Sequence, residues 1–445
     1  MSQTCDGEVL SMLALLGFGI IAVFLYTTMT RKLSIPVALI IIPVVFGLIG
    51  GFGTEIGKMM ISGIVKVTPS AMIPIFAVIY FGLMIDAGMF DPMVNKILKL
   101  VKGDPVKITI GAAVLAMLVS LDGDGTTTFI ISVTAMYPIT RKINMNPLIL
   151  PFAVGMAAGV MNPLPWSGPT TRVMATLQSD ASVVFNPIIP AMVAGIAWVL
   201  FACYYVGKKE RARLGMADLG GNVLAESNFD GVDQDLSIKR PHLFWFNVIM
   251  TVLIIAGLLA EIMPMATLFV IGFAIAITVN YPNLKDQQER MKNYSAEVVT
   301  IVTLIFSAGC FTGILSGTKM VTEMARALVS LIPQGMGSLL PLVVAITSMP
   351  LSLVFPTDAY YFGVLPVIYE MAASIGIEPV QIGRAAILGQ MTVGFPLSPL
   401  AAATLVLISV AKVNLVEHQK FMFLWAFGTT IVMTIVAYLT GALTF

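Results

Sequence analysis

The chain has 445 residues, of which 58% are apolar and 11% are charged, whereas soluble domains carry about a quarter charged residues. Its 25 Lys and Arg residues nearly balance its 24 Asp and Glu residues, so it lacks the basic excess of proteins that bind nucleic acids. These values exclude a soluble globular protein and a nucleic-acid partner. They predict an all-α polytopic membrane protein whose long apolar helices cross the lipid bilayer.

The sequence also lacks the usual signs of an enzyme or of a secreted protein. It contains no Walker loop, metalloprotease signature or nucleophile elbow. Cys5, Cys203 and Cys310 are odd in number and scattered, which fits packing residues better than disulfides or a metal cluster. His242 and His418 lie beside the ends of predicted spans, where we expect rings that contact interfacial water. The first nine residues are acidic, so we expect no cleavable signal peptide.

The chain opens with three predicted scaffold spans within residues 10–90, over 10–29, 33–53 and 71–90. Arg31 and Lys32 separate the first two, and because basic residues favour the cytoplasmic side, the amino terminus is expected outside. Residues 54–69 are expected to form an irregular connection. Residues 91–103 have apolar positions at helical spacing and lysines on the other face, which is typical of a helix lying in the membrane interface. We call this segment the first arm.

Next comes a polar tip, Leu121–Thr128 (LDGDGTTT), between two short apolar segments within residues 107–140. Each segment is shorter than the about 20 residues that cross a bilayer, and basic residues flank both ends, so a re-entrant inner hairpin is predicted. A span over 147–180 follows, and it is interrupted within residues 161–169 by three prolines and a glycine. Polar groups at this depth are tolerated only where they face protein or an aqueous cavity.

A span over 183–206 ends the first half, residues 1–207, and a cytoplasmic linker covers 208–240. The second half, residues 241–445, repeats the plan, with Lys285, Arg290 and Lys292 expected in a cytoplasmic connection. Its predicted elements are scaffold spans within 242–317, an arm over 318–335, an outer hairpin over 339–374 with its tip at Phe355–Phe362, a span over 380–412 broken at Gly394–Pro399, and a last span over 421–443.

The repeat is visible in residue spacing as well as in outline. Asp124 and Pro163 are as far apart in the first half as Thr357 and Pro396 are in the second. The basic residues orient the two halves oppositely. The predicted fold is therefore an inverted repeat of two five-span halves, each with a re-entrant hairpin and a broken helix, which is the signature of secondary transporters.

The tips and breaks should meet near the middle of the bilayer and form a polar site there. Neutral donors that suit the oxygens of a carboxylate cargo are Thr126, Thr127, Asn162, Ser167, Thr170, Thr171, Thr357, Tyr360 and Ser398. Arg172 adds a guanidinium suited to a bidentate contact. Helices starting after Gly125 and Asp358 should also present unpaired N–H groups to an anion.

The site also contains three acids that would repel a polyanion arriving without a compensating positive charge, namely Asp122, Asp124 and Asp358. An anion fits such a site if it arrives with positive charge, as protons on the aspartates or as a bound metal. Mg²⁺ and Ca²⁺ prefer oxygen ligands, so either is expected as part of the cargo, with no permanently bound cofactor.

Structural roles remain open for several of these residues. Asp122 and Asp358 are also suited to capping helices, and Arg172 to extending its guanidinium to the outer interface. Tyr360 and Tyr361 are also suited to packing. Asp86 is expected to be an interfacial charge, and Arg384 a partner for some carboxylate.

The tip Leu121–Thr128, the break Asn162–Arg172 (NPLPWSGPTTR) and the opening segments Met12–Phe18 (MLALLGF) and Met29–Ser34 (MTRKLS) resemble the citrate–divalent metal:proton symporter family (CitMHS) of the ion transporter superfamily. The resemblance covers nearly the whole chain. The Ser-Asn-Thr triplet typical of the related sodium symporters is absent from both tips.

The resemblance implies proton-driven uptake of a citrate–metal complex across the cell membrane, here the bacterial inner membrane. It also implies an elevator mechanism, in which hairpins and broken spans move against a scaffold that forms a homodimer. In that case Asp122, Asp124 and Asp358 would carry protons or contact the metal, and the polar donors would hold citrate.

Two other functions remain compatible with the residues. One is a proton-coupled carrier of another di- or tricarboxylate or a sugar acid without metal, and the other is a cation/proton antiporter. A membrane enzyme is not expected, because nothing resembles a nucleophile with its base or a redox site.

Overall fold

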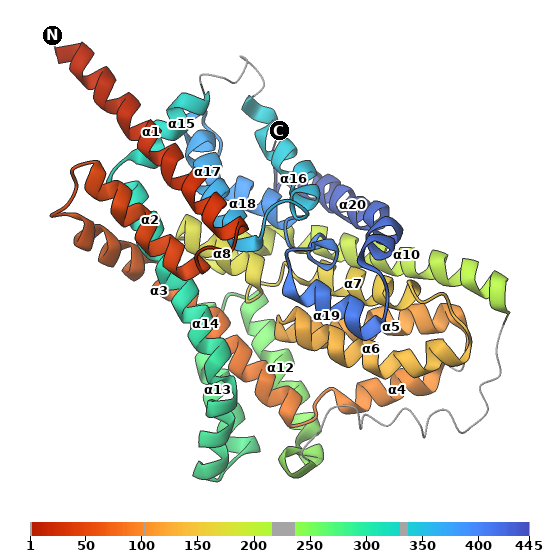
Figure 1. Ribbon diagram of the computed structural model, residues 1–445. Helices are drawn as coiled ribbons and strands as arrows, with labels where there is room; N and C mark the ends of the chain where they lie inside the picture. Colours follow the sequence, from red (N-terminus) through yellow and green to blue (C-terminus); the bar gives the residue numbers. More distant parts are fainter. Residues whose placement is uncertain (1, 102, 216–235, 330–336, 445) are drawn as a thin grey trace.

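The computed structural model describes residues 2–101, 103–215, 236–329 and 337–444, and its regular elements there are helices (Figure 1). In the first half they are α1 (Ser2–Met29), α2 (Ile35–Ile49), α3 (Ile56–Asp86), α4 (Asp91–Val101), α5 (Pro105–Val119), α6 (Gly125–Lys142), α7 (Ile149–Met161), α8 (Gly168–Leu177), α9 (Ala181–Phe185) and α10 (Ile189–Leu214). In the second half they are α12 (Phe244–Leu259), α13 (Met265–Asn280), α14 (Leu284–Gly317), α15 (Met320–Val329), α16 (Leu340–Leu351), α17 (Leu365–Ser374), α18 (Pro379–Ile387), α19 (Ala402–Ala411) and α20 (Leu415–Leu439).

Seven helical stretches among the described residues are long and apolar enough to cross a membrane, so the prediction of an all-α polytopic membrane protein is confirmed. The order of elements in the second half follows that in the first. In each half a long helix, α3 or α14, leads into a short amphipathic helix, α4 or α15. Two helices joined by a tip come next, and then a helix pair separated by an irregular stretch.

Several predicted boundaries are wrong. Residues 54–69 are not an irregular connection, because α3 begins at Ile56 and runs through Pro69 and Pro74 to Asp86. Lys285, Arg290 and Lys292 lie in the first turns of α14 and not in a loop. α10 continues to Leu214, into the predicted linker, of which residues 216–235 lie outside the described part.

The long helices α3 and α14 cross at glycines. A Cβ added to Gly63 would lie 2.0 Å from the carbonyl oxygen of Gly309, and one added to Gly313 would lie 2.3 Å from that of Met59. Small residues allow helix backbones to approach this closely in a membrane, where packing and not hydrophobic burial drives association. At the other end of the pair, Arg290 of α14 lies 3.0 Å from Asp86, which Tyr294 also contacts. Asp86 therefore ties two helices together and is not a simple interfacial charge.

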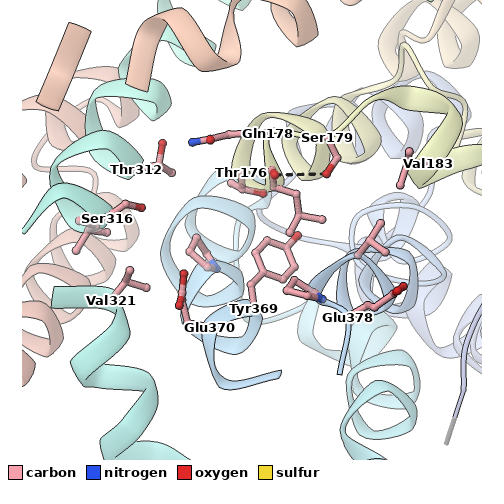
Figure 2. Close-up of a pocket in the computed structure, with 15 residues that line it drawn as sticks. Thr176, Gln178, Ser179, Val183, Thr312, Ser316, Val321, Tyr369, Glu370 and Glu378 are labelled. Carbon is pink, nitrogen blue, oxygen red and sulfur yellow. Dashed lines mark hydrogen bonds between the residues drawn. The ribbon is translucent and has the colours of Figure 1, made fainter. Parts of the chain in front are cut away.

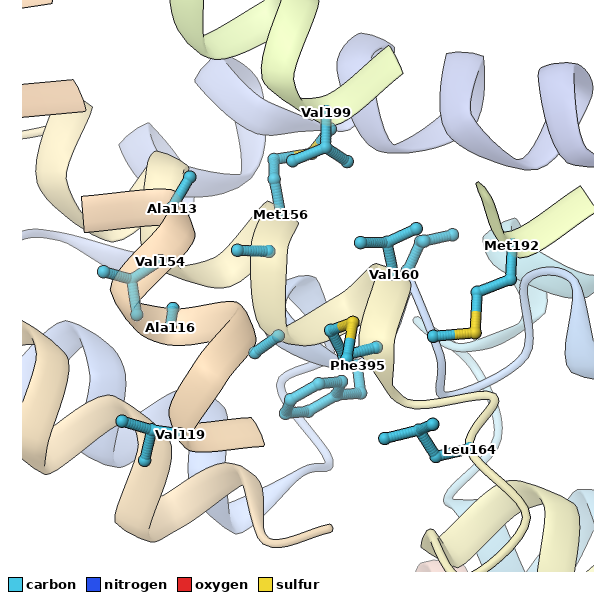
Figure 3. Close-up of a cluster of buried hydrophobic side chains, with 14 of the residues drawn as sticks. Ala113, Ala116, Val119, Val154, Met156, Val160, Leu164, Met192, Val199 and Phe395 are labelled. Carbon is cyan, nitrogen blue, oxygen red and sulfur yellow. The ribbon is translucent and has the colours of Figure 1, made fainter. Parts of the chain in front are cut away.

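The hairpin helices, the interrupted helices, α10 and α20 pack around a shared core, which also includes side chains of α3, α12 and α13. Figure 3 shows side chains of α5, α7 and α10 converging there, together with Leu164 and Phe395 from the two irregular stretches. Cys203 is buried in this core, and Cys310 is buried on α14, as expected of packing residues. Because both irregular stretches lie inside the core, the backbone groups that they free must find partners in the protein.

The arms have the predicted two faces. In α4, Val94, Leu98 and Val101 are buried, whereas Lys96 and Lys99 are exposed. Helix α15 packs against α1 and α17, with Met320 and Met324 buried.

Candidate functional site

The inner tip is a tight turn that only glycine allows. Residues Ser120–Asp122 form one 3₁₀ turn after α5, and Gly123 follows with φ of 81°. A Cβ on Gly123 would also lie 3.1 Å from Cδ1 of Trp166. The indole Nε1 of Trp166 donates a 2.8 Å hydrogen bond to the carbonyl of Leu121, so the tip is fastened to the first irregular stretch.

The two aspartates of this tip stabilise its turn. Asp122 accepts a hydrogen bond from the backbone N–H of Asp124 at 2.9 Å. The carboxylate of Asp124 accepts from the N–H groups of Thr126 and Thr127 at 3.1 and 2.7 Å, which makes Asp124 the N-cap of α6. The prediction that these N–H groups are free for an anionic cargo is wrong, because Asp124 occupies them.

The outer tip contacts Arg172, the guanidinium that the sequence predicted at the site. Arg172 of α8 donates from Nε to Oδ1 of Asp358 at 2.6 Å, and from Nη1 to the carbonyl of Gly168 at 2.8 Å. The two side chains are 18% and 13% exposed. Asp358 makes no side-chain cap, so the capping role expected as its alternative is excluded, and the guanidinium of Arg172 bonds to groups inside the protein.

The first break, residues 162–167, connects α7 to α8. The amide of Asn162 donates to the carbonyl of Met391 in the second break at 2.6 Å. Thr170 donates to the carbonyl of Pro163 at 2.7 Å, and Thr171 to that of Gly168 at 2.9 Å. Thr170 therefore satisfies a backbone group that the break frees, and Thr171 bonds within α8. The buried hydroxyl of Ser167 has no partner among the described residues.

The second break is longer than predicted, because α18 ends at Ile387 and α19 begins at Ala402. Within it Met391 has φ of 51°, an unfavourable value for a residue with a side chain. Three bonds hold the segment in place. Met391 donates its N–H to Ser352 of the outer hairpin at 2.8 Å, its carbonyl accepts from Asn162, and Tyr361 donates to the carbonyl of Gln390 at 2.8 Å.

Three consecutive carbonyls of this break each have a side-chain donor. Those of Phe395, Pro396 and Leu397 accept from Thr404, His418 and Gln419 respectively. His418 is fully buried, so the expectation of a water-exposed ring is wrong, while His242 is exposed as expected. Arg384 donates to the carbonyls of Val183 and Ala442, and not to the carboxylate expected for it.

The four polar segments thus contact one another. Cβ atoms added to Gly123 and Gly125 of the inner tip would lie 3.4 Å from Oγ of Ser167 and 2.8 Å from the ring of Phe395. Ser398 donates to the carbonyl of Ser352 at 2.5 Å, which joins the second break to the outer hairpin. Tyr360 is buried and packs against Tyr361, with ring centroids 5.4 Å apart. Thr357 is partly exposed at the outer tip.

Sequence reasoning missed three polar residues here. Glu297 lies on α14 and interacts electrostatically with Asp122 and Asp124. The signal was present, since Glu297 is an acid within the predicted scaffold region 242–317. The amide nitrogen of Gln390 and the hydroxyl of Thr392 are buried without partners among the described residues. Nothing in the sequence gave a reason to select Gln390 or Thr392, because the second break was expected to begin at Gly394, after both residues.

A cavity of about 470 Å³ lies beside the site, between α8, α14, α17 and α18 (Figure 2). Thr176 and Tyr369 line it, and Thr176 donates to the carbonyl of Arg172 at 2.9 Å. The cavity therefore reaches the helix turn that carries Arg172.

The sequence profile of the CitMHS family, described as "Citrate transporter", matches residues 25–389. Three relatives come from Bacillus subtilis (strain 168). A citrate transporter is 50% identical over 98% of this chain and 100% of its own length. A Mg(2+)/citrate complex secondary transporter is 47% identical over 97% and 99%, and an uncharacterized transporter, YraO, is 45% identical over 97% and 100%.

Two solved structures share the fold at 13% sequence identity. The YdaH transporter of Alcanivorax borkumensis aligns with a TM-score of 0.63 over 97% of this chain and 98% of its own. MtrF of Neisseria gonorrhoeae aligns with a TM-score of 0.59 over 88% of this chain and 85% of its own.

Proposed function

The chain belongs to the CitMHS family of citrate transporters, and from this premise we propose that it imports citrate as a complex with a divalent cation, coupled to protons. Mg²⁺ is the first candidate, because one relative of 47% identity is a Mg(2+)/citrate complex transporter. Ca²⁺ is the second, since the same oxygen ligands serve it. The family is one of transporters, so no enzymatic activity is proposed.

The ion pair between Arg172 and Asp358 is the observation that carries this proposal. The two charged side chains of this partly buried pair are 2.6 Å apart. Each can leave its partner at little cost only if another group with the same charge as that partner takes its place. A carboxylate of citrate would replace Asp358 on Arg172, and the metal ion or a proton would replace Arg172 on Asp358. This exchange leaves no unpaired charge at membrane depth. Citrate without a metal ion or proton would pair with Arg172 but leave the carboxylate of Asp358 unpaired.

The inner tip offers the second set of acids for metal or proton coupling. Asp124 caps α6 with two hydrogen bonds, and an ionised carboxylate has about four lone-pair sites, so two remain. Asp122 and Glu297 lie near enough to interact with it electrostatically. Of the neutral donors predicted for citrate, Thr126, Thr127 and Thr357 are partly exposed and Ser167 retains an unused hydroxyl. Thr170, Thr171 and Ser398 already donate to backbone carbonyls, so each would have to exchange its partner to bind citrate.

For the mechanism we propose an inverted repeat that works as an elevator, with the amino terminus outside. The scaffold would be α1–α3 and α12–α14, with α3 and α14 locked at their glycine crossing. The two hairpins and the two interrupted helices would move as one body, since hydrogen bonds already join them. The arms α4 and α15 would connect the two parts, and two copies would pair through the scaffold.

Uptake of labelled citrate into proteoliposomes tests the proposal. With an imposed pH gradient, uptake is expected with Mg²⁺ or another divalent cation and is expected to stop when EDTA removes the metal. Uptake that is insensitive to EDTA would support a metal-free carboxylate carrier instead. Substrate-free proton or sodium exchange would support an antiporter.

A further inference from the structure

A second, positively charged cleft lies next to the cavity beside Arg172. Its volume is about 350 Å³, and it forms where α3 crosses α14 beside the end of α8. Polar side chains that line it are Lys58, Ser62 and Lys66 of α3, Thr312 and Ser316 of α14, and Gln178. No carboxylate is among its lining residues. We call this cleft the lysine groove.

The two lysines face the groove because of helical spacing. Lys58, Ser62 and Lys66 are four residues apart and therefore lie on one face of α3. Lys58 also lies 3.1 Å from Glu55, but both side chains are more than half exposed, and such pairs contribute little. The groove consequently keeps a net positive charge.

The groove and the cavity share a neutral rim. Gln178, Thr312 and Ser316 line both. Figure 2 shows Gln178 extending from the end of α8 towards Thr312 on α14. Beyond the rim the cavity leads to Thr176, one helical turn after Arg172. Glu370 and Glu378 line the cavity, so the positive charge is confined to the groove.

We infer that the lysine groove is a vestibule that attracts the anionic cargo before it reaches Arg172. This inference rests on the proposed function and adds a site to it. A complex of citrate with one divalent cation keeps one negative charge and free carboxylate oxygens, which suit ammonium groups. Clefts lined by one sign of charge raise the local concentration and the association rate of oppositely charged ligands.

The expected size of the effect follows from Coulomb attraction. One charge in water at roughly 10 Å from another changes occupancy about twofold. In neutral phosphatidylcholine liposomes at low salt, Lys58→Gln and Lys66→Gln should each raise the KM for Mg²⁺–citrate about twofold, and the double variant about fourfold. The maximal rate should not change. At about 0.3 M salt the differences should vanish, because the Debye length falls below about 10 Å.

Three further variants control for charge and place. Lys66→Arg keeps the charge and should behave as wild type, and Glu55→Gln should lower the KM, because it removes a negative charge beside Lys58. Lys285→Gln alters an exposed lysine at the far end of α14, about 46 Å from Ser316, and should leave the KM unchanged.

The anion that the lysines bind could instead belong to a lipid headgroup, because Ile61 and Val65 on the neighbouring face of α3 are exposed. Adding phosphatidylglycerol separates the two sources. If the KM of the lysine variants differs from wild type only in anionic liposomes, or if it never differs at low salt, the inference is overturned. If the wild type takes up no metal–citrate at all, the proposed function itself fails.

Discussion

Neutralising Arg172 alone should destabilise the protein more than neutralising Arg172 and Asp358 together. Their charged atoms are 2.6 Å apart, and the side chains are 18% and 13% exposed. Charge centres about 4 Å apart at an effective dielectric constant of about 20 attract by about 4 kcal/mol before desolvation is counted. Arg172→Gln leaves Asp358 charged without a partner, which costs about 3–5 kcal/mol.

The double variant, with Asp358→Asn added, places two neutral amides where the ions were. Replacing a buried ion pair by well-packed hydrophobic residues of similar volume is often neutral or stabilising, and two neutral amides likewise leave no unpaired charge. We therefore expect the double variant to recover to within about 1 kcal/mol of the wild type. Even if Asp358→Asn alone cost nothing, the coupling energy of the cycle would then be about 2–4 kcal/mol in magnitude, well above the ~0.5 kcal/mol within which independent sites add.

Unfolding in mixed detergent micelles, followed by tryptophan fluorescence, measures the four free energies. If the two single effects add, Arg172 and Asp358 are not coupled, and the exchange of partners proposed for them loses its basis. Transport gives a second readout. The double variant should be stable yet inactive, because Arg172 is needed to hold citrate, and active uptake by this variant would remove Arg172 from the cargo site.

Asp124→Asn should fold normally, since Asn is as good an N-cap as Asp, but proton-driven metal–citrate uptake should be lost; undiminished uptake in proteoliposomes would contradict the coupling role. Gly63→Ala should lower the thermal stability of the detergent-solubilised protein, because its new Cβ would lie 2.0 Å from a carbonyl oxygen of α14. Gly57→Ala on the same helix meets nothing within 4 Å and should be neutral or stabilising by up to about 1 kcal/mol; equal effects of the two would show that the crossing is not tight. His418→Leu should cost about 1–3 kcal/mol in unfolding free energy, because it leaves the carbonyl of Pro396 unsatisfied, and a stability equal to wild type would show that this bond contributes nothing.

The positions of the tips and breaks were predictable because they violate the rules of an apolar span. Asp124 and Asp358 stand within segments otherwise too apolar for acids, and Pro163 and Pro396 stand where helices must stop. The equal spacing from Asp124 to Pro163 and from Thr357 to Pro396 indicated a common site. What the sequence did not contain was the pairing itself, since Arg172 and Asp358 are 186 positions apart and meet only through tertiary packing.

The predictions that were wrong also failed because of tertiary packing that the sequence does not show. Residues 54–69 were expected to be irregular, yet α3 runs through Pro69, as membrane helices tolerate proline where neighbours satisfy the freed carbonyls. Met391 carries no local signal for φ of 51°, because bonds from Asn162 and Ser352 impose it. His418 stood near the end of a span by hydropathy, but the first turns of α20 pack beneath the second break and bury it.

The carbonyls of Phe395, Pro396 and Leu397 each already accept a hydrogen bond from Thr404, His418 or Gln419. Without these donors, this non-helical segment would present a row of unpaired carbonyl oxygens, which are the ligands that alkali ions prefer. Here each of these oxygens already gives one of its two lone pairs to a side-chain donor, so less negative charge is available to a Na⁺ or K⁺ ion. These three donors therefore disfavour the binding of monovalent cations along the second break.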